Sequence, residues 1–261
     1  MVRQHVSRNA IRVPRVNRPV KRSKFVINAE TTGQFAVDDP SSGVSLFDDL
    51  HVTELGLDFE RQAFGLGYRY VAGLDEVGRG CLAGPVVAAA CILDPAKPLP
   101  QGLNDSKKLT PDVRERIAAE LRHDCLAYAI GQIEADEIDR INILEATKRA
   151  MIAAIEKLVP QADFLLIDAI QLKQCPLPQR PIIRGDSLSA SIAAASVLAK
   201  VFRDDLMREY DNVYPQYGFS SHKGYGAPIH WESIRAHGPC AIHRLSFHGV
   251  VSEPTGSQNL F

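Results

Sequence analysis

Two apolar segments that follow each other closely in the chain place the strongest limit on its fold. Residues 70–75 and 85–93 carry few polar side chains, and residues rich in glycine lie between them. Short apolar runs bounded by turn residues are typical of strands buried on both faces of a sheet. We therefore expect a hairpin-like pair of buried strands, the first of which runs into the carboxylates of Asp75 and Glu76.

Strand and helix patterns alternate after this pair. Short apolar runs indicate strands, and apolar residues at helical spacing behind a capping residue indicate helices. Expected in order are a helix from Thr110 to about Leu121, a strand over 125–133, a helix over 141–158, a strand over 164–168, and a helix from Asp186 or Ser187 to about Tyr210. The alternation predicts an α/β domain, with short helices and loops in the last fifth of the chain.

The first 60 residues lack this periodicity and divide by charge. Residues 1–24 hold eight Arg or Lys and no acid, and residues 25–60 hold eight acids and no base. A basic opening fits an organelle transit peptide, a phosphate-binding arm or an over-long assigned start. We expect a disordered N-terminal extension over 1–60, a catalytic domain over 61–250 and a flexible tail over 251–261.

Several classes of protein are excluded by what the chain lacks. Its five cysteines are scattered without a C-x-x-C pair, which argues against a disulfide framework or a thiolate zinc site. No apolar run approaches the roughly 20 residues that span a bilayer. The spacing of the glycines in residues 78–84 does not match a dinucleotide fingerprint, and no phosphate-binding P-loop is present. We expect a cytoplasmic, monomeric protein that does not bind membranes.

Four carboxylates are candidates for a metal site. Adjacent acids at the end of a buried strand are costly unless a cation meets them, and Asp168 ends another apolar strand. Asp75, Glu76, Asp168 and Asp186 together form an oxygen-only donor set that suits Mg²⁺ or Mn²⁺. A solvated strand end, or a simple N-cap at Asp186, is the alternative for each residue alone. Gly73 and Gly78 are expected to bend the backbone so that both neighbouring acids reach one site.

Other groups are suited to a nucleic-acid backbone. They are the bare-backbone loop of Gly78, Arg79 and Gly80, the polar loop of Ser106, Lys107 and Lys108, and the cationic and aromatic group of His222, Lys223 and Tyr225. Guanidinium and ammonium groups contact phosphates, and an aromatic ring stacks on a sugar or base. Taken alone, each has a plain alternative as a turn, a solvated lysine or a packed ring. The histidines of the C-terminal fifth are expected to be capping or phosphate-contact groups.

These motifs together resemble the ribonuclease HII family, the type 2 ribonucleases H. The resemblance covers residues 68–250 and is carried by seven motifs in the family's order. They are residues 73–80 (GLDEVGRG), 82–90 (LAGPVVAAA), 103–109 (LNDSKKL), 185–187 (GDS), 192–204 (IAAASVLAKVFRD), 222–226 (HKGYG) and 243–247 (HRLSF).

The resemblance implies a ribonuclease H-like fold with a mixed sheet of about five strands, flanking helices and a small helical C-terminal part. It implies an endonuclease that cleaves the RNA of RNA/DNA hybrids, and DNA on the 5′ side of an embedded ribonucleotide, by two-metal hydrolysis that leaves 5′-phosphate and 3′-hydroxyl ends. By the resemblance, Asp75, Glu76, Asp168 and Asp186 bind the metals, Gly78, Arg79 and Gly80 read the 2′-hydroxyl, and Tyr225 stacks at the RNA–DNA junction. Ala169 departs from the glycine that the family pattern places after the third acid.

Two other interpretations remain at this point. Ribonuclease HIII shares the four acids but has an added N-terminal domain, for which residues 1–60 are too short and too irregular. A nucleic-acid-binding module without catalysis is disfavoured because all four carboxylates are retained. At the other end of the chain, Leu260 and Phe261 loosely resemble the terminal anchors by which repair proteins bind a sliding clamp, so a clamp is a candidate partner.

Overall fold

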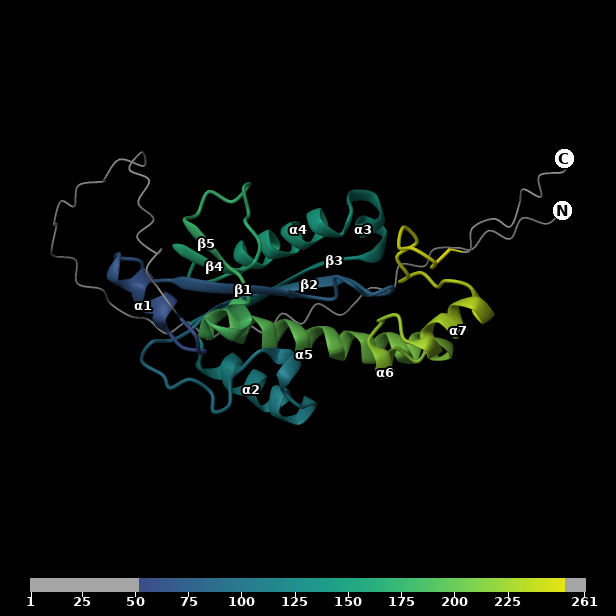
Figure 1. Cartoon of the computed structure of the whole chain (residues 1–261), viewed down its shortest axis with the longest axis horizontal. Helices are drawn as coiled ribbons and strands as arrows, with labels where there is room; N and C mark the ends of the chain where they lie inside the picture. The colour runs from purple at the N-terminus through teal and green to yellow at the C-terminus, as the bar shows by residue number, and fades with distance from the viewer. Residues whose placement is uncertain (1–51, 252–261) are drawn as a thin grey trace. The chain divides into compact units, whose positions relative to one another are not determined.

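The computed structural model describes residues 52–251, and a five-stranded mixed sheet lies at their centre. The strands are β1 (Val71–Val77), β2 (Val86–Ile92), β3 (Ala127–Ile133), β4 (Phe164–Asp168) and β5 (Gln179–Ile182). Their order across the sheet is β3-β2-β1-β4-β5 (Figure 1). The pairs β1–β2 and β2–β3 are antiparallel, whereas β4 runs parallel to β1 and β5. The expected α/β class, the mixed sheet and the hairpin-like first pair are confirmed.

Helices cover both faces of the sheet (Figure 1). They are α1 (Asp58–Gly65), α2 (Pro111–Asp124), α3 (Ala135–Ile141), α4 (Ile143–Ile155), α5 (Ala190–Val213), α6 (Phe219–His222) and α7 (Pro228–His237), with short 3-10 turns η1 (Ser106–Lys108), η2 (Gly185–Ser187) and η3 (Pro215–Tyr217). One apolar core lies between the sheet and α4, and a second lies between the sheet, α5 and α2. Because both faces are covered, every residue of β2 is buried.

Glycine allows the helices on the two faces to approach the sheet closely. A Cβ at Gly73 would lie 2.0 Å from the carbonyl carbon of Ser191 in α5, and one at Gly131 would lie 1.9 Å from the carbonyl oxygen of Ala150 in α4. Gly73 keeps a regular ladder to Cys91 and Leu166. The expectation that Gly73 bends β1 is therefore wrong: its missing side chain makes room for α5.

Two helix starts differ from the sequence expectation, and helices α1 and α3 and strand β5 were not predicted. The helical pattern over 141–158 is interrupted at Asn142, which has φ 71° and whose side chain accepts hydrogen bonds from Leu144 N and Glu145 N, so α3 and α4 are separate helices. Ser189, not Asp186 or Ser187, caps α5, and its hydroxyl accepts from Ile192 N at 3.3 Å. Asp186 lies instead in η2, and its carboxylate does not serve as the cap of α5.

The folded body starts before residue 61. The predicted boundary at residue 60 falls inside α1, where Phe59 and Glu60 are buried. Gly56 exchanges backbone hydrogen bonds with Leu188 and Ala190. The basic arm 1–24 lies outside the described residues, as do most of the acidic segment and the tail anchors Leu260 and Phe261.

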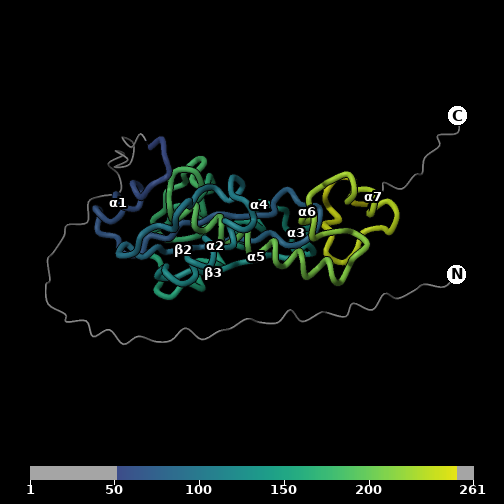
Figure 2. Tube along the Cα trace, turned by 90° about the horizontal axis from the view of Figure 1, so that it is seen from below, coloured from purple at the N-terminus to yellow at the C-terminus, as the bar shows by residue number. Residues whose placement is uncertain are grey.

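The C-terminal part packs as a separate apolar cluster on the end of α5. Its buried members come from the Leu82–Ala83 loop, α5, η3, α6, α7 and the last residues before Val251. Figure 2 shows α6 and α7 beside the C-terminal half of α5. None of the helices in the described range is both long enough and apolar enough to cross a membrane.

Candidate active site

The four carboxylates lie where β1, β4 and η2 meet. β1 and β4 are parallel neighbours, so Asp75 of β1 and Asp168, the last residue of β4, reach the same edge of the sheet. Glu76 follows Asp75 in β1, and Asp186 is the middle residue of η2, which follows β5. Asp75 is only 4% exposed and Asp186 only 6%. Three separate segments therefore bring four acids to one region, as the sequence predicted.

Asp75 is the most deeply buried of the four. Its carboxylate accepts a hydrogen bond from the backbone N–H of Glu76 at 2.7 Å, and the Ser196 hydroxyl of α5 also acts to lower its pKa. Burial raises its pKa well above the usual range, and the charge of Glu76 raises it further. These two groups oppose the shift without cancelling it. The protein alone therefore leaves the negative charge of Asp75 poorly compensated.

Glu76 is held on one side only. Its Oε1 accepts from Arg79 Nη1 at 3.1 Å, whereas Oε2 is buried and has no hydrogen-bond partner among residues 52–251. Burial raises the pKa of Glu76, while the Arg79 guanidinium lowers it. A buried carboxylate oxygen without a partner costs on the order of 1–3 kcal/mol. A bound cation or water beside Glu76 would supply the missing partner.

Asp168 and Asp186 each have one internal partner. Asp168 Oδ1 accepts from the backbone N–H of Gly185 at 2.8 Å, and Asp186 Oδ2 lies 3.3 Å from Lys107 Nζ. Burial raises the pKa of Asp168, and the charge of Asp186 raises it as well. Lys107 is thus the cation nearest to Asp186, and its ammonium is itself largely exposed.

The donor set fits a hard divalent cation in its chemistry. All four groups are carboxylates, one buried oxygen lacks a partner, and their mutual repulsion raises the pKa of Asp75 and Asp168. In residues 52–251, however, no three His, Cys, Asp or Glu side chains stand close enough to hold a metal as they are. Three of the four carboxylates are instead engaged with Arg79, Lys107 and the backbone of Gly185.

The glycine loop after β1 opens next to these acids. Gly78 has φ 92°, so its positive φ supports the expected turn of the chain just beyond Glu76. A Cβ on Gly80 would meet no atom within 4 Å, which leaves open space beside its backbone. Arg79 lies between them, about half exposed, with its guanidinium on Glu76.

In the loop of Ser106, Lys107 and Lys108, the two lysines lie beside Asp186 and Ser187, whereas Ser106 does not face the site. Lys108 Nζ lies 3.2 Å from Ser187 Oγ, next to Asp186. Ser106 is buried, and its hydroxyl lies 2.8 Å from that of Ser196, the residue that acts to lower the pKa of Asp75. The expectation that Ser106 contacts a phosphate is therefore wrong, because its hydroxyl is turned into the protein beneath the acids.

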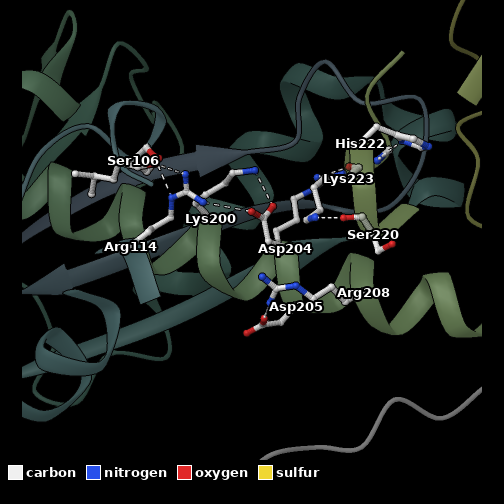
Figure 3. A network of polar contacts seen from close by, with 12 residues as sticks. Ser106, Arg114, Lys200, Asp204, Asp205, Arg208, Ser220, His222 and Lys223 are labelled. Atoms are coloured by element: carbon white, nitrogen blue, oxygen red, sulfur yellow. Dashed lines mark hydrogen bonds and ion pairs between the residues drawn. The ribbon is translucent and has the colours of Figure 1, made fainter. Parts of the chain in front are cut away.

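A polar network on α5 joins this loop to the 222–225 segment (Figure 3). Arg114 donates to the carbonyl of Ser106 at 3.0 Å and lies 3.5 Å from Asp204, which also accepts from Lys200 at 2.7 Å. Lys200 Nζ lies 6.0 Å from the ring centre of Tyr225. Figure 3 shows these side chains along one side of α5, with Lys223 further on.

In the 222–225 segment Tyr225 is exposed, whereas His222 is bonded within the protein. Tyr225 is 42% exposed, so its ring is available for stacking. The expectation that His222 contacts a phosphate is wrong, because Nε2 faces the carbonyl of Tyr217 at 2.8 Å and Nδ1 accepts from Gly224 N. Lys223 bonds the carbonyl of Ser220 and stays on the surface.

The other conspicuous histidines of this region lie in its core. His230 and His243 are 0% and 2% exposed, and their Nε2 atoms lie 3.1 Å apart. Both rings cap backbone groups, as expected, because His230 Nδ1 lies 2.8 Å from the carbonyl of Tyr225 and His243 Nδ1 accepts from Cys240 N. The expectation that they also contact phosphates is wrong, since neither reaches the surface.

Sequence reasoning missed several residues that support the site. Glu60 accepts from the hydroxyls of Ser189 and Ser191 at 2.6 Å each, close to the turn that carries Asp186. Arg203 and Arg244 are fully buried and donate to the backbone of the glycine loop. Charged residues inside otherwise apolar stretches were the available signal, because a buried charge needs defined partners.

Comparison with known families agrees with this geometry. The family model described as Ribonuclease HII matches residues 72–250. A ribonuclease HII of Ruminiclostridium cellulolyticum is 56% identical over 191 residues, which cover 73% of this chain and 74% of the relative. One of Geobacillus kaustophilus is 52% identical over 202 residues, or 77% of each chain.

Solved structures show the same fold. Ribonuclease H2 of Pyrococcus horikoshii OT3 aligns with a TM-score of 0.60 and 25% identity, over 70% of this chain and 95% of that one. RNase HII in a PCNA complex from Archaeoglobus fulgidus aligns with a TM-score of 0.59 and 25% identity, over 69% and 95%. A Bst-RNase HIII in complex with Mn²⁺ aligns with a TM-score of 0.55 and 21% identity, over 72% and 70%.

Proposed function

The chain belongs to the ribonuclease HII family and cleaves the RNA of RNA/DNA hybrids, and we propose that Asp75, Glu76, Asp168 and Asp186 are its catalytic, metal-binding residues. The observation that carries this proposal is that these acids meet at the ends of β1 and β4 and in η2, where a buried Glu76 oxygen has no partner within residues 52–251. We propose further that the enzyme incises DNA on the 5′ side of an embedded ribonucleotide.

Mg²⁺ or Mn²⁺ held by these carboxylates would supply Lewis-acid stabilisation of the charge that develops on the phosphodiester oxygens. The preference for these ions follows from the oxygen-only donor set. The Mn²⁺ in the related RNase HIII structure supports the choice by analogy.

The chain's own groups prepare the site and then contact the substrate. Arg79 and Lys107 stabilise the carboxylate charges of Glu76 and Asp186 in the protein alone. Both side chains lie beside the acids, where they would contact the phosphates next to the cleavage point. Lys108 and Lys223 add cationic groups on either side of the site.

Specificity for RNA depends on the 2′-hydroxyl, the group that DNA lacks. We propose that the open backbone of Gly78, Arg79 and Gly80 contacts it. A side chain at Gly80 would project into the space where the sugar must come. Tyr225 then stacks on the neighbouring deoxyribose or base, and stacking of this kind is worth about 1–3 kcal/mol.

The test is cleavage of a DNA duplex that carries one ribonucleotide, with both new ends mapped, in Mg²⁺ and in Mn²⁺. We expect a cut on the 5′ side of the ribonucleotide that leaves a 3′-hydroxyl and a 5′-phosphate. A 2′,3′-cyclic phosphate would contradict metal-assisted hydrolysis, because it arises from attack by the 2′-oxygen.

Further proposals concern the segments outside the described residues. The basic arm 1–24 would add phosphate contacts, and Leu260 and Phe261 would bind a sliding clamp, as the complex of the Archaeoglobus fulgidus relative with PCNA suggests. Binding of the purified clamp to the full chain and to a Leu260→Ala, Phe261→Ala variant tests the second proposal. Equal binding, or no binding by either protein, would refute it. We propose that the enzyme acts in the cytoplasm as a monomer.

A further inference from the structure

Two buried guanidinium groups lie against the loop that follows β1. Arg203 of α5 and Arg244 of the C-terminal segment are both 0% exposed. Both direct their N–H groups at backbone carbonyl oxygens, and five of their six hydrogen bonds end on residues 79–85. Burying two cations costs free energy, so the carbonyls that they bind indicate their structural role.

Arg203 joins the glycine loop to the segment that carries Tyr225. Its Nε and Nη2 donate to the carbonyls of Pro85 and Ala83 at 3.0 Å each, and its Nη1 donates to the carbonyl of Lys223 at 2.8 Å. The guanidinium also occupies the place of a side chain at Gly78, because a Cβ there would lie 2.3 Å from Nε. One planar group thereby holds both proposed recognition segments at a set separation.

Arg244 holds the loop at its middle. Its Nη1 donates to the carbonyl of Arg79 at 2.9 Å, and its Nε and Nη2 both donate to the carbonyl of Gly84, at 3.0 and 2.9 Å. Burial lowers the pKa of Arg244 to about 10, so it stays charged at neutral pH. Its guanidinium lies 5.1 Å from the ring centre of Phe247, which fixes its plane further.

The contact with Arg79 sets the direction of the next amide. A peptide unit is planar and trans, so the carbonyl of Arg79 and the N–H of Gly80 point in opposite directions within one plane. Arg244 holds the carbonyl toward the protein, and the N–H therefore points away from it. Within residues 52–251, the N–H of Gly80 has no acceptor, and Gly80 borders open space.

We propose that Arg203 and Arg244 are positioning residues for ribonucleotide recognition, with Arg244 orienting the N–H of Gly80 so that it donates to the 2′-hydroxyl. This inference rests on the proposed role of the glycine loop and deepens it. Lysine cannot replace either arginine in this role, since one ammonium does not span two carbonyls in a fixed plane.

Substitution of Arg244 by lysine tests the inference, because the charge remains while the planar fork is lost. We would measure Kd in EDTA for a duplex with one ribonucleotide and for the all-DNA duplex of the same sequence. We expect the wild-type preference for the ribonucleotide to fall about tenfold in Arg244→Lys, the factor that corresponds to one hydrogen bond. Affinity for the all-DNA duplex should change little.

Asp139→Asn is the matched control. Asp139 anchors the same C-terminal segment, accepting from Leu245 N at 2.9 Å and from Ser246 N at 3.0 Å, but it does not contact the loop. This variant should keep the wild-type preference. Equal loss of preference in both variants would overturn the inference, as would an unchanged preference in folded Arg244→Lys. A wild-type protein without any preference would instead refute the proposed role of the loop itself.

A measurement on the unaltered protein covers the case in which Arg244→Lys does not fold. With ¹⁵N-labelled arginine, the Nε–H groups of Arg203 and Arg244 should exchange with solvent far more slowly than those of exposed arginines. Fast exchange of both would show that the guanidiniums do not hold the loop.

Discussion

The acid site and the C-terminal part both bury ionisable groups, but they differ in how many of these groups have hydrogen-bond partners. Around β1 and β4, negative groups are brought together with too few partners, so burial and repulsion raise the pKa of Asp75 and Asp168 and one Glu76 oxygen has no partner. In the C-terminal part, all three guanidinium nitrogens of Arg203 and all three of Arg244 donate to backbone carbonyls. The first region thus lacks partners for its charges, whereas every nitrogen of the two guanidinium groups in the second has one.

The buried histidines of the C-terminal part show the same completeness. Cys240 N donates to His243 Nδ1 at 2.9 Å, and His230 Nδ1 lies 2.8 Å from the carbonyl of Tyr225, an acceptor only. His243 must therefore carry its proton on Nε2, which donates to His230 Nε2. Both rings are neutral with one tautomer each, and an added proton would set two N–H groups against each other. Burial accordingly lowers the pKa of each histidine to about 4.

The two regions therefore contribute differently to binding and to stability. A cluster of charges without partners lowers the stability of the ligand-free protein, and binding of a cation or substrate restores that stability. This behaviour is typical of functional sites. A completed network holds the backbone around it in one arrangement.

The largest effect is expected from Asp75→Asn. Cleavage should fall on the order of a thousandfold, the scale on which removal of one preorganised electrostatic group acts. In EDTA, the free energy of unfolding should rise by about 1 kcal/mol, because one charge leaves a repulsive cluster. Activity assays and urea unfolding measure the two effects. Glu134→Gln is the control, since burial also raises the pKa of Glu134 outside the cluster; a similar loss of activity there would break the comparison.

Arg203→Ala should act in the opposite direction on stability. Three carbonyls lose their donor and a cavity forms, so the free energy of unfolding should fall by about 3–5 kcal/mol. Urea unfolding in EDTA gives this value. A loss below 1 kcal/mol would mean that water replaces the guanidinium, and that the second region is less complete than its hydrogen bonds indicate.

The two regions should also respond to pH with opposite signs. Folded His230 and His243 accept protons only near pH 4, whereas in the unfolded chain they accept them near pH 6.5. Their contribution to stability is therefore lost as pH falls from about 6.5 to about 4. The raised pKa of Asp75 and Asp168 has the reverse consequence, since the folded acids take up protons first and gain stability as pH falls.

Unfolding measured from pH 7 to 4.5 in EDTA can separate the two contributions. A His230→Gln, His243→Gln variant should lose stability less steeply with falling pH than the wild type does. Asp75→Asn should lose it more steeply. Identical slopes for all three proteins would contradict the assignment of neutral histidines and repelling acids.

The smallest effect is expected from Ala169→Gly. Ala169 follows Asp168 with φ 51°, a conformation that favours glycine, so the departure from the family pattern adds backbone strain to the acid site. Glycine should raise the free energy of unfolding by about 0.5–1 kcal/mol. Ala193→Gly within α5 is the control and should lower it by about 1 kcal/mol. Two changes of the same sign would show that Ala169 is not strained.

Strands β1 to β4, helices α2, α4 and α5, and the four candidate acids could be predicted because their signals are local, whereas α1, α3 and β5 were missed. A buried strand is apolar over successive residues, and Asp75, Glu76 and Asp168 stand where such runs end. The positive φ at Ala169 explains why glycine was expected there. Even the errors at Asn142 and Ser189 are shifts of a boundary, since several polar residues near a helix start can serve as its cap.

Only the tertiary structure decided how these acids are supported. Arg244 and Gly84 are 160 positions apart, and Ser106 and Ser196 are 90 apart, so no local pattern joins them. The same holds for Gly73, which must lack a side chain because the backbone of α5 lies against it. Strands, helices and the carboxylates that follow the strands could be read from the sequence, because periodicity and residue type act over a few neighbouring positions. Which buried groups find partners depends on packing between distant segments, and that separates the incomplete acid site from the completed network beside it.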